Sequence, residues 1–279
     1  MDASMDRKLI AIDLDGTTLN NKSRITPLTR RTLQHLSDQG HMVCIVTGRP
    51  FRNSEGIYRH LNIQTPMVNF NGALCHFPGN PEWLAGYHHE LDREIAFELF
   101  ANQKELAIDL LCAEGRDRLF TSSMNLPDSP FYPVDRANVS RLSRESLTYN
   151  PTALTIFCEE NKQELIADNI TKAYGDDVSV RTWGGDLPVL EVVRNGIHKA
   201  VGVKAIADFY RIPNEAIIAF GDEDNDLEMI DFAGVGVAMA NAIDEIKAVS
   251  NQQTEFSNDE DGLARHLIQY FDLDIPVDA

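Results

Sequence analysis

The sequence predicts an α/β protein built on a doubly wound parallel sheet that is interrupted by an inserted α+β domain. Three short apolar runs support the sheet: LIAI at 9–12, MVCIV at 42–46 and AIIAF at 216–220. Each run is rich in β-branched residues and unbroken, as expected for strands buried on both faces. A glycine follows each run, which indicates that each strand ends in a turn.

A helix is expected between the first two strands, at residues 25–40. Thr26 suits the N-cap, Pro27 the first helical position and Gly40 the stop. This gives a strand–helix–strand unit, which is typical of an α/β sheet. Beyond the third strand we expect a strand at 234–239 and helices around 226–233, 242–250 and 262–271. The two ends of the chain, 1–85 and 190–279, therefore form one predicted domain.

The middle of the chain, residues 86–189, has a different pattern. Helical spacing occurs at 93–108 and 162–174, and strand-like runs occur at 152–160 and 178–182. The stretch 122–140 is rich in Pro, Ser and Asn, so it is expected to be mostly loop. We interpret this region as a separate α+β insert.

Charge and composition limit the classes of partner. The chain has 279 residues, with 25 basic and 43 acidic side chains, and a formal charge of −18. This balance argues against nucleic acid or an anionic membrane as the main partner. A small anionic ligand stays compatible with it, because salt screens distant charges within about 10 Å. Nothing in the sequence assigns an oligomeric state.

The sequence also favours a cytoplasmic protein. No apolar run approaches the roughly 20 residues of a membrane span, and the N-terminus lacks the apolar centre of a signal peptide. The four cysteines are far apart and form no CxxC pair, which fits a reduced interior rather than a zinc site. They are Cys44, Cys75, Cys112 and Cys158.

Carboxylates gather where the predicted strands end. The three runs lead into Asp13-Leu14-Asp15, Thr47-Gly48-Arg49 and the acidic segment 221–226. Ligands bind beyond the carboxyl ends of strands in open α/β sheets. Each acidic residue alone could be a helix cap or turn former. Several carboxylates at one sheet edge instead favour a hard divalent cation, and Mg²⁺ suits such oxygen ligands.

A phosphate site is the second hypothesis for this edge. Thr47 and Gly48 offer a hydroxyl and a backbone N–H at the start of a helix, which suits a phosphate oxygen. A phosphate also calls for a side-chain cation. Lys199 precedes the helix that leads into the third strand, whereas Lys204 lies inside that helix, where a solvated face is expected. Spacing alone does not choose between these two lysines.

Four segments resemble the motifs of the haloacid dehalogenase (HAD) superfamily: DLDGT at 13–17, TGR at 47–49, Lys199, and GDEDNDLEM at 221–229. The chain is most similar to the Cof-type sugar-phosphate phosphatases, which have a Rossmann-like core and a cap domain inserted between the second and third motifs. NFNGA at 69–73 and GVGVAMANA at 234–242 extend the resemblance from end to end.

The resemblance implies a role for each motif residue. Asp13 would be the nucleophile that attacks phosphorus, and Asp15 would pass a proton to the leaving oxygen and later take one from water. Mg²⁺ would be held by the Asp13 carboxylate, the Asp15 backbone carbonyl and the Asp222 carboxylate. Asp226 would orient Lys199 or a metal-bound water. The phosphate oxygens would be held by Thr47, Gly48, Lys199, Asn225 and the backbone N–H of Leu14.

Three positions leave alternatives open. Thr18 stands where a leucine is common in the family. Glu223 occupies a position often taken by a small residue, where it would either add a carboxylate near the metal or face solvent. Arg49 would either contact the substrate or pair with a nearby acid.

The resemblance implies a Mg²⁺-dependent phosphatase of small phosphorylated metabolites, acting through an aspartyl-phosphate. A cap of roughly one hundred residues favours an enclosed site and a small substrate. Sugar phosphates, flavin mononucleotide and pyridoxal phosphate all fit this class. Two alternatives stay open: a phosphomutase or phosphotransferase that uses the same intermediate, and a non-catalytic metabolite-binding protein that kept the fold.

Overall fold

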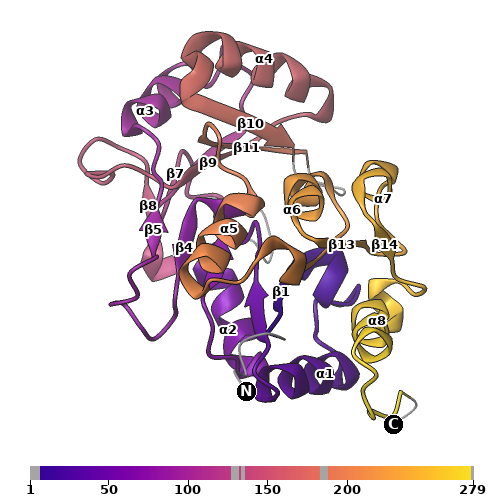
Figure 1. Cartoon of the computed structure of the whole chain (residues 1–279). Helices are drawn as coiled ribbons and strands as arrows, with labels where there is room; N and C mark the ends of the chain where they lie inside the picture. The colour runs from indigo at the N-terminus through magenta and orange to yellow at the C-terminus, as the bar shows by residue number, and fades with distance from the viewer. Residues whose placement is uncertain (1–6, 127–131, 133–135, 183–187, 278–279) are drawn as a thin grey trace. The chain divides into compact units, whose positions relative to one another are not determined.

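The computed structural model describes residues 7–126, 132, 136–182 and 188–277. The chain groups into two compact units (Figure 1). Unit 1 contains residues 1–49, 54–87 and 198–279, and unit 2 contains residues 50–53 and 88–197. The interpretation of 86–189 as a domain with those bounds stays a prediction.

Unit 1 is built on a five-stranded sheet with the order β14-β13-β12-β1-β2. All four neighbouring pairs are parallel. The three predicted strands are confirmed as β1, β2 and β12, and every residue in them is buried. The bounds are β1 (Leu9–Ile12), β2 (Met42–Ile45), β12 (Ile217–Gly221), β13 (Val235–Ala238) and β14 (Gln252–Gln253).

The sheet is doubly wound. From β1 the chain crosses through α1 to β2 on one side, and from β12 it crosses through α6 to β13 on the other. Because such crossovers are right-handed, helices cover both faces, and the winding reverses between β1 and β12. The helices are α1 (Pro27–Asp38), α2 (Phe51–Leu61), α5 (Lys199–Tyr210), α6 (Leu227–Phe232), α7 (Asp244–Val249) and α8 (Gly262–Tyr270).

Helix α1 begins where the sequence predicts. The Thr26 hydroxyl accepts a hydrogen bond from the backbone N–H of Thr29 at 3.1 Å, and Pro27 is the first helical residue. Leu33 and Leu36 are fully buried on its inner face. The helix stops before Gly40, whose φ of +93° lies in the left-handed region that favours glycine.

A hairpin follows α2 in unit 1. Strands β3 (Met67–Asn69) and β4 (Leu74–His76) are antiparallel, and a single parallel bridge joins Val46 to Val68. This bridge places the end of β3 beside the residues that follow β2. In the sequence, β5 (Tyr87–His88) lies where the chain passes into unit 2.

Unit 2 is an α+β unit with a six-stranded sheet of order β10-β11-β9-β6-β7-β8. Helices α3 and α4 lie on the same face of this sheet (Figure 1), and Phe97 and Ile166 from them share a buried core with Leu111 and Ile156. The bounds are α3 (Arg93–Ala101), α4 (Gln163–Tyr174), β6 (Leu110–Glu114), β7 (Leu119–Thr121), β8 (Val139–Arg141), β9 (Ala153–Phe157), β10 (Val178–Thr182) and β11 (Val189–Arg194).

Two predicted segments differ from the structure. The helix expected at 93–108 ends at Ala101, because Asn102 turns back to donate its amide to the Glu98 carbonyl and Ala107 has a left-handed φ of +55°. The predicted loop at 122–140 lies partly outside the described residues, and its last two residues belong to β8.

The described helices include none with both the length and the apolar character needed to cross a bilayer. All four cysteines are buried free thiols.

Candidate active site

Three carboxylates meet where the winding of the sheet reverses. Asp13 follows β1 and Asp222 follows β12, and these strands pair with Ile12 opposite Phe220. Asp226 comes from the short turn after Asp222. All three side chains are buried, and each offers an oxygen within 4.8 Å of the others. The parallel pairing of two strands thus brings together carboxylates that lie about two hundred residues apart in the sequence.

Lys199, the first residue of α5, lies against two of these carboxylates. Its Nζ donates to Asp13 Oδ1 at 2.7 Å and to Asp226 Oδ1 at 2.6 Å, and the side chain is 0% exposed. The other Asp226 oxygen accepts backbone N–H groups at 3.1 and 3.3 Å. Lys204 is 60% exposed and pairs with Asp208. Of the two candidate lysines, the structure brings Lys199 to the site.

The charges in this cluster do not balance. Asp13, Asp222 and Asp226 face one ammonium, so ionised carboxylates leave two negative charges uncompensated. Burial raises the pKa of Asp13 to about 7, against the opposing attraction of Lys199. Burial and the charge of Asp13 raise the pKa of Asp222 to about 9. Burial lowers the pKa of Lys199, but its two carboxylate partners more than offset this, and the result lies above the ordinary lysine value.

The donor set fits a divalent cation. Hard carboxylate oxygens suit Mg²⁺, and two positive charges would offset the imbalance. Asp222 accepts a hydrogen bond from the Thr17 hydroxyl on Oδ1 at 2.7 Å, and its Oδ2 packs against the bare Cα of Gly16. A Cβ at Gly16, where φ is +71°, would lie 2.0 Å from that oxygen. Asp226 is a poorer ligand, because Lys199 and two N–H groups already occupy its oxygens.

The turn after β1 holds Asp13 in place. The Thr18 hydroxyl donates to the Asp13 backbone carbonyl, a bond that the leucine common at this position could not make. The Leu19 N–H closes the turn onto the Leu14 carbonyl at 2.8 Å, and Leu14 is fully buried. Asn241, from the GVGVAMANA segment, donates its amide to the Gly16 carbonyl at 2.8 Å. The turn is therefore tied to the opposite end of the sequence.

Asp15 lies apart from the buried cluster, with a side chain that is 58% exposed. Arg49 forms a bidentate pair with the Asp15 carboxylate: Nε donates to Oδ2 at 2.7 Å, and Nη2 donates to Oδ1. Burial lowers the pKa of Arg49, but its bonds to Asp15 raise it overall. Of the two roles left open for Arg49, the structure records the pairing with an acid, and that acid is the expected proton donor.

Thr47, Gly48 and Asn225 contact Asn71, an asparagine that the sequence did not assign to the site. Thr47 is buried and accepts the Arg49 N–H on its hydroxyl at 3.1 Å. Asn225 donates its amide to Asn71 Oδ1 at 3.0 Å, and a Cβ at Gly48 would lie 3.0 Å from the same oxygen. The available signal was the Asn-Gly pair in NFNGA, which is typical of a left-handed backbone.

Glu223 is a capping residue. Its side chain accepts a backbone N–H of the turn 224–226, and the Asp226 side chain reciprocates in a capping box. Burial raises the pKa of Glu223, while a backbone hydrogen bond from Asp224 opposes the shift. Glu223 is half-buried and is absent from the described group of three converging carboxylates.

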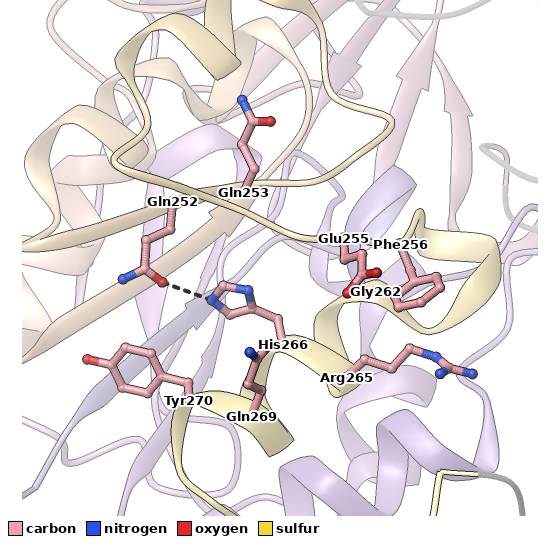
Figure 2. Close-up of a pocket in the computed structure, with 9 residues that line it drawn as sticks. All are labelled: Gln252, Gln253, Glu255, Phe256, Gly262, Arg265, His266, Gln269 and Tyr270. Atoms are coloured by element: carbon pink, nitrogen blue, oxygen red, sulfur yellow. Dashed lines mark hydrogen bonds between the residues drawn. The ribbon is translucent and has the colours of Figure 1, made fainter.

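A separate pocket of about 320 Å³ lies between β14 and α8 (Figure 2). His266 Nε2 contacts Gln252 Oε1 at 3.0 Å across it, and Tyr270 and Arg265 also line it. Burial lowers the pKa of His266, which favours a neutral ring that donates to the Gln252 oxygen. None of the predicted site residues lines this pocket, so it is distinct from the carboxylate cluster.

Known proteins are similar to this chain in sequence and in fold. The chain is 39% identical over 269 residues to 5-amino-6-(5-phospho-D-ribitylamino)uracil phosphatase YitU of Bacillus subtilis (strain 168), covering 95% of this chain and 98% of the relative. A putative phosphatase of Metamycoplasma hominis is 30% identical, covering 91% and 93%. A solved haloacid dehalogenase-like hydrolase from Bacteroides thetaiotaomicron superposes with a TM-score of 0.83 at 25% identity, covering 95% and 100%.

The family match spans the same segments that build the site. Residues 10–267 match the family of haloacid dehalogenase-like hydrolases, a range that includes every carboxylate described above. The chain belongs to the haloacid dehalogenase-like hydrolases.

Proposed function

We propose that this phosphoric monoester hydrolase requires Mg²⁺ and forms an aspartyl-phosphate on Asp13. One observation carries the proposal: Lys199 holds the buried Asp13 carboxylate by Oδ1 alone. Among the described residues, Oδ2 accepts no hydrogen bond, so one carboxylate oxygen is left for the reaction. A fixed carboxylate beside a buried cation is suited to attack a phosphorus atom.

Mg²⁺, held by the Asp13 and Asp222 carboxylates and the Asp15 backbone carbonyl, would neutralise charge so that a phosphate can approach the nucleophile. Asp13 then forms the bond to phosphorus as the bond to the leaving oxygen breaks. Asp15 gives a proton to that oxygen, and later takes one from the water that attacks the aspartyl-phosphate. The transferring oxygens are held by Lys199, Thr47, Asn225 and the backbone N–H groups of Leu14 and Gly48.

The Arg49 pairing sets a condition on this chemistry. Both Asp15 oxygens accept hydrogen bonds from the guanidinium in this structure. Each oxygen keeps a further lone-pair site, so a leaving group would have to approach Asp15 beside the guanidinium or displace one of its bonds.

We further propose 5-amino-6-(5-phospho-D-ribitylamino)uracil as the substrate. The support is the identity of 39% to the Bacillus subtilis phosphatase of that name, over nearly the full length of both chains. The compound is a phosphomonoester at the end of a flexible chain, so it belongs to the small phosphorylated metabolites that the site chemistry accommodates. Simple sugar phosphates are the second candidate class.

Release of inorganic phosphate from a panel of substrates tests both proposals. The panel contains the ribitylaminouracil phosphate, several sugar phosphates, flavin mononucleotide and pyridoxal phosphate, each with Mg²⁺ and with a chelator. We expect release only with Mg²⁺, and a kcat/KM at least about tenfold higher for the ribitylaminouracil phosphate. Turnover that survives chelation would contradict the metal requirement. Transfer of phosphate to a second sugar position would favour the mutase alternative.

The metal-free protein should lose stability as pH rises. The folded-state pKa values of Asp13 and Asp222, about 7 and about 9, lie above the ordinary value of 3.8. The folded chain therefore binds more protons than the unfolded chain between about pH 4 and pH 9, and the free energy of unfolding falls with pH across that window. Mg²⁺ should raise the melting temperature more at about pH 8 than at about pH 6, because protons compete with the metal.

Thermal unfolding at both pH values, with chelator and then with Mg²⁺, measures this effect. At one hundred times its dissociation constant the metal adds about 2.7 kcal/mol. The matched control is Asp222→Asn, which should lose most of the response to Mg²⁺. A response that is equally large in this variant would show that Mg²⁺ stabilises the chain elsewhere.

A further inference from the structure

Three consecutive residues between β3 and β4 have a left-handed backbone. The φ angles of Phe70, Asn71 and Gly72 are +51°, +51° and +105°. Glycine adopts this region readily and asparagine tolerates it, but a phenylalanine does so rarely. Such a backbone persists only where its surroundings hold it, and it is often found at functional sites.

Hydrogen bonds tie this turn to the segment after β2. The Asn71 N–H donates to the Thr47 carbonyl at 3.2 Å, and the Phe70 N–H donates to the Arg49 carbonyl at 3.4 Å. The Asn69 side chain donates to the same Arg49 carbonyl at 2.8 Å. The turn and the TGR segment therefore form one hydrogen-bonded unit.

The same turn packs against the start of α5. A Cβ at Gly72 would lie 2.2 Å from the backbone carbonyl oxygen of His198, the residue before Lys199. The Tyr87 hydroxyl donates to the Gly72 carbonyl at 2.9 Å. Glycine is required here by both the close approach and the φ angle.

The Asn71 side chain reaches a third segment. It is buried, accepts the Asn225 amide on Oδ1 at 3.0 Å, and lies in close contact with Gly48. We propose that Asn71 is a positioning residue that holds Asn225 and the Gly48 backbone in register for the phosphate. This inference rests on the proposed function.

The chemistry of the amide group explains how Asn71 would act. The Asn225 NH₂ group has two hydrogens, and the bond to Asn71 uses one of them. The other hydrogen is then directed by a fixed partner rather than by a rotating side chain. Fixing a donor in advance removes the cost of ordering it when the phosphate binds. Loss of Asn71 should therefore weaken the contribution of Asn225 without removing Asn225.

Asn71→Gly tests the proposal, because glycine keeps the left-handed backbone and removes the side chain that carries the carboxamide. We expect kcat/KM to fall by about 10- to 100-fold, mainly through a higher KM, and inhibition by inorganic phosphate to weaken in parallel. The matched control is Asn62→Gly. Asn62 is exposed, has a φ of +52° and lies outside the site, so its replacement should change kcat/KM by less than about twofold.

A double-mutant cycle separates positioning from direct contact with the substrate. In the Asn225→Ala background, Asn71→Gly should lower kcat/KM by a smaller factor than it does in the wild type, because one of the two groups that it positions is already gone. The loss that remains belongs to the Gly48 backbone. Asn71→Asp keeps the left-handed backbone and the oxygen that Asn225 bonds. In the Asn71→Asp background, Asn225→Ala should therefore lower kcat/KM by nearly the same factor as in the wild type.

The inference would be overturned if the factors by which the two single substitutions lower kcat/KM simply multiply in the double variant. It would also be overturned if Asn71→Gly has normal kinetics. A lower melting temperature with unchanged KM would also overturn it, because it would show a purely structural role. If Asn71→Gly does not fold, Asn71→Ser takes its place in the same cycle, because serine also lacks the carboxamide oxygen that Asn225 bonds. Absence of phosphate release by the wild-type protein would instead contradict the proposed function.

Discussion

Replacing Asp13 with asparagine should lower kcat by at least about 10⁴-fold, the largest effect expected of any single substitution in this chain. The asparagine amide is a poor nucleophile, and the remaining groups cannot supply the covalent step. The loss corresponds to about 5.5 kcal/mol of transition-state stabilisation. Asp13→Asn should also abolish the phosphorylated enzyme that brief incubation with substrate and rapid acid quenching would trap in the wild-type protein.

The loss of activity should not come from unfolding. Burial raises the pKa of the Asp13 carboxyl to about 7, so at higher pH its ionisation opposes folding in the absence of metal. A neutral asparagine of nearly the same shape removes that penalty, while Lys199 keeps its bond to Asp226. We expect the metal-free Asp13→Asn protein to unfold at the same temperature as the wild type or higher at about pH 8.

Asp224→Asn is the matched control for Asp13→Asn. Asp224 is an exposed carboxylate in the same acidic segment as Asp222, but it is absent from the described group of buried converging carboxylates. Its replacement should leave kcat within about twofold of the wild-type value. Near-normal turnover by Asp13→Asn would show that another group attacks phosphorus, and a labelled residue other than Asp13 would identify it.

The sheet could be predicted because its signals are local. Strands β1, β2 and β12 are unbroken apolar runs, and Thr26 and Pro27 mark the start of α1 by local signals. A hydrogen bond from the Thr26 hydroxyl to the distant Asp261 carboxylate supports that start, and no local pattern predicts it. The carboxylate cluster was predictable for a related reason. Parallel strands bring their carboxyl ends to one edge, so residues that follow such runs must come together.

Features that depend on side-chain packing could not be predicted in the same way. The choice of Lys199 over Lys204 required the geometry of α5, which buries the first lysine against Asp13 and exposes the second. The hydrogen bonds from Arg49 to Asp15 depend on side-chain conformations, which cannot be predicted from the spacing of residues in the sequence. Asn71 has a local signal for its backbone angle, but its contact with Asn225 spans 154 residues.

The second large effect is expected from Lys199→Ala, which should destabilise the chain and damage the site together. Asp13 and Asp226 would be left buried without their counter-charge, and breaking a buried pair in this way costs about 3–5 kcal/mol of unfolding free energy. Loss of a preorganised cation should also lower kcat/KM by about 10²- to 10³-fold. Chemical denaturation and steady-state kinetics measure the two effects separately.

Lys204→Ala is the control, and Lys199→Met separates charge from packing. Lys204 and Asp208 are both mostly exposed, so losing their pair should cost no more than about 1 kcal/mol and leave kcat/KM unchanged. Methionine at 199 keeps most of the buried stem, so a loss of stability that persists in Lys199→Met belongs to the missing charge. Lys199 lowers the pKa of Asp13, so its removal lets Asp13 take up a proton at a higher pH, and the loss of stability should shrink as pH falls toward about 7. A larger effect of Lys204→Ala on kcat/KM would show that the cation at the phosphate site is the other lysine.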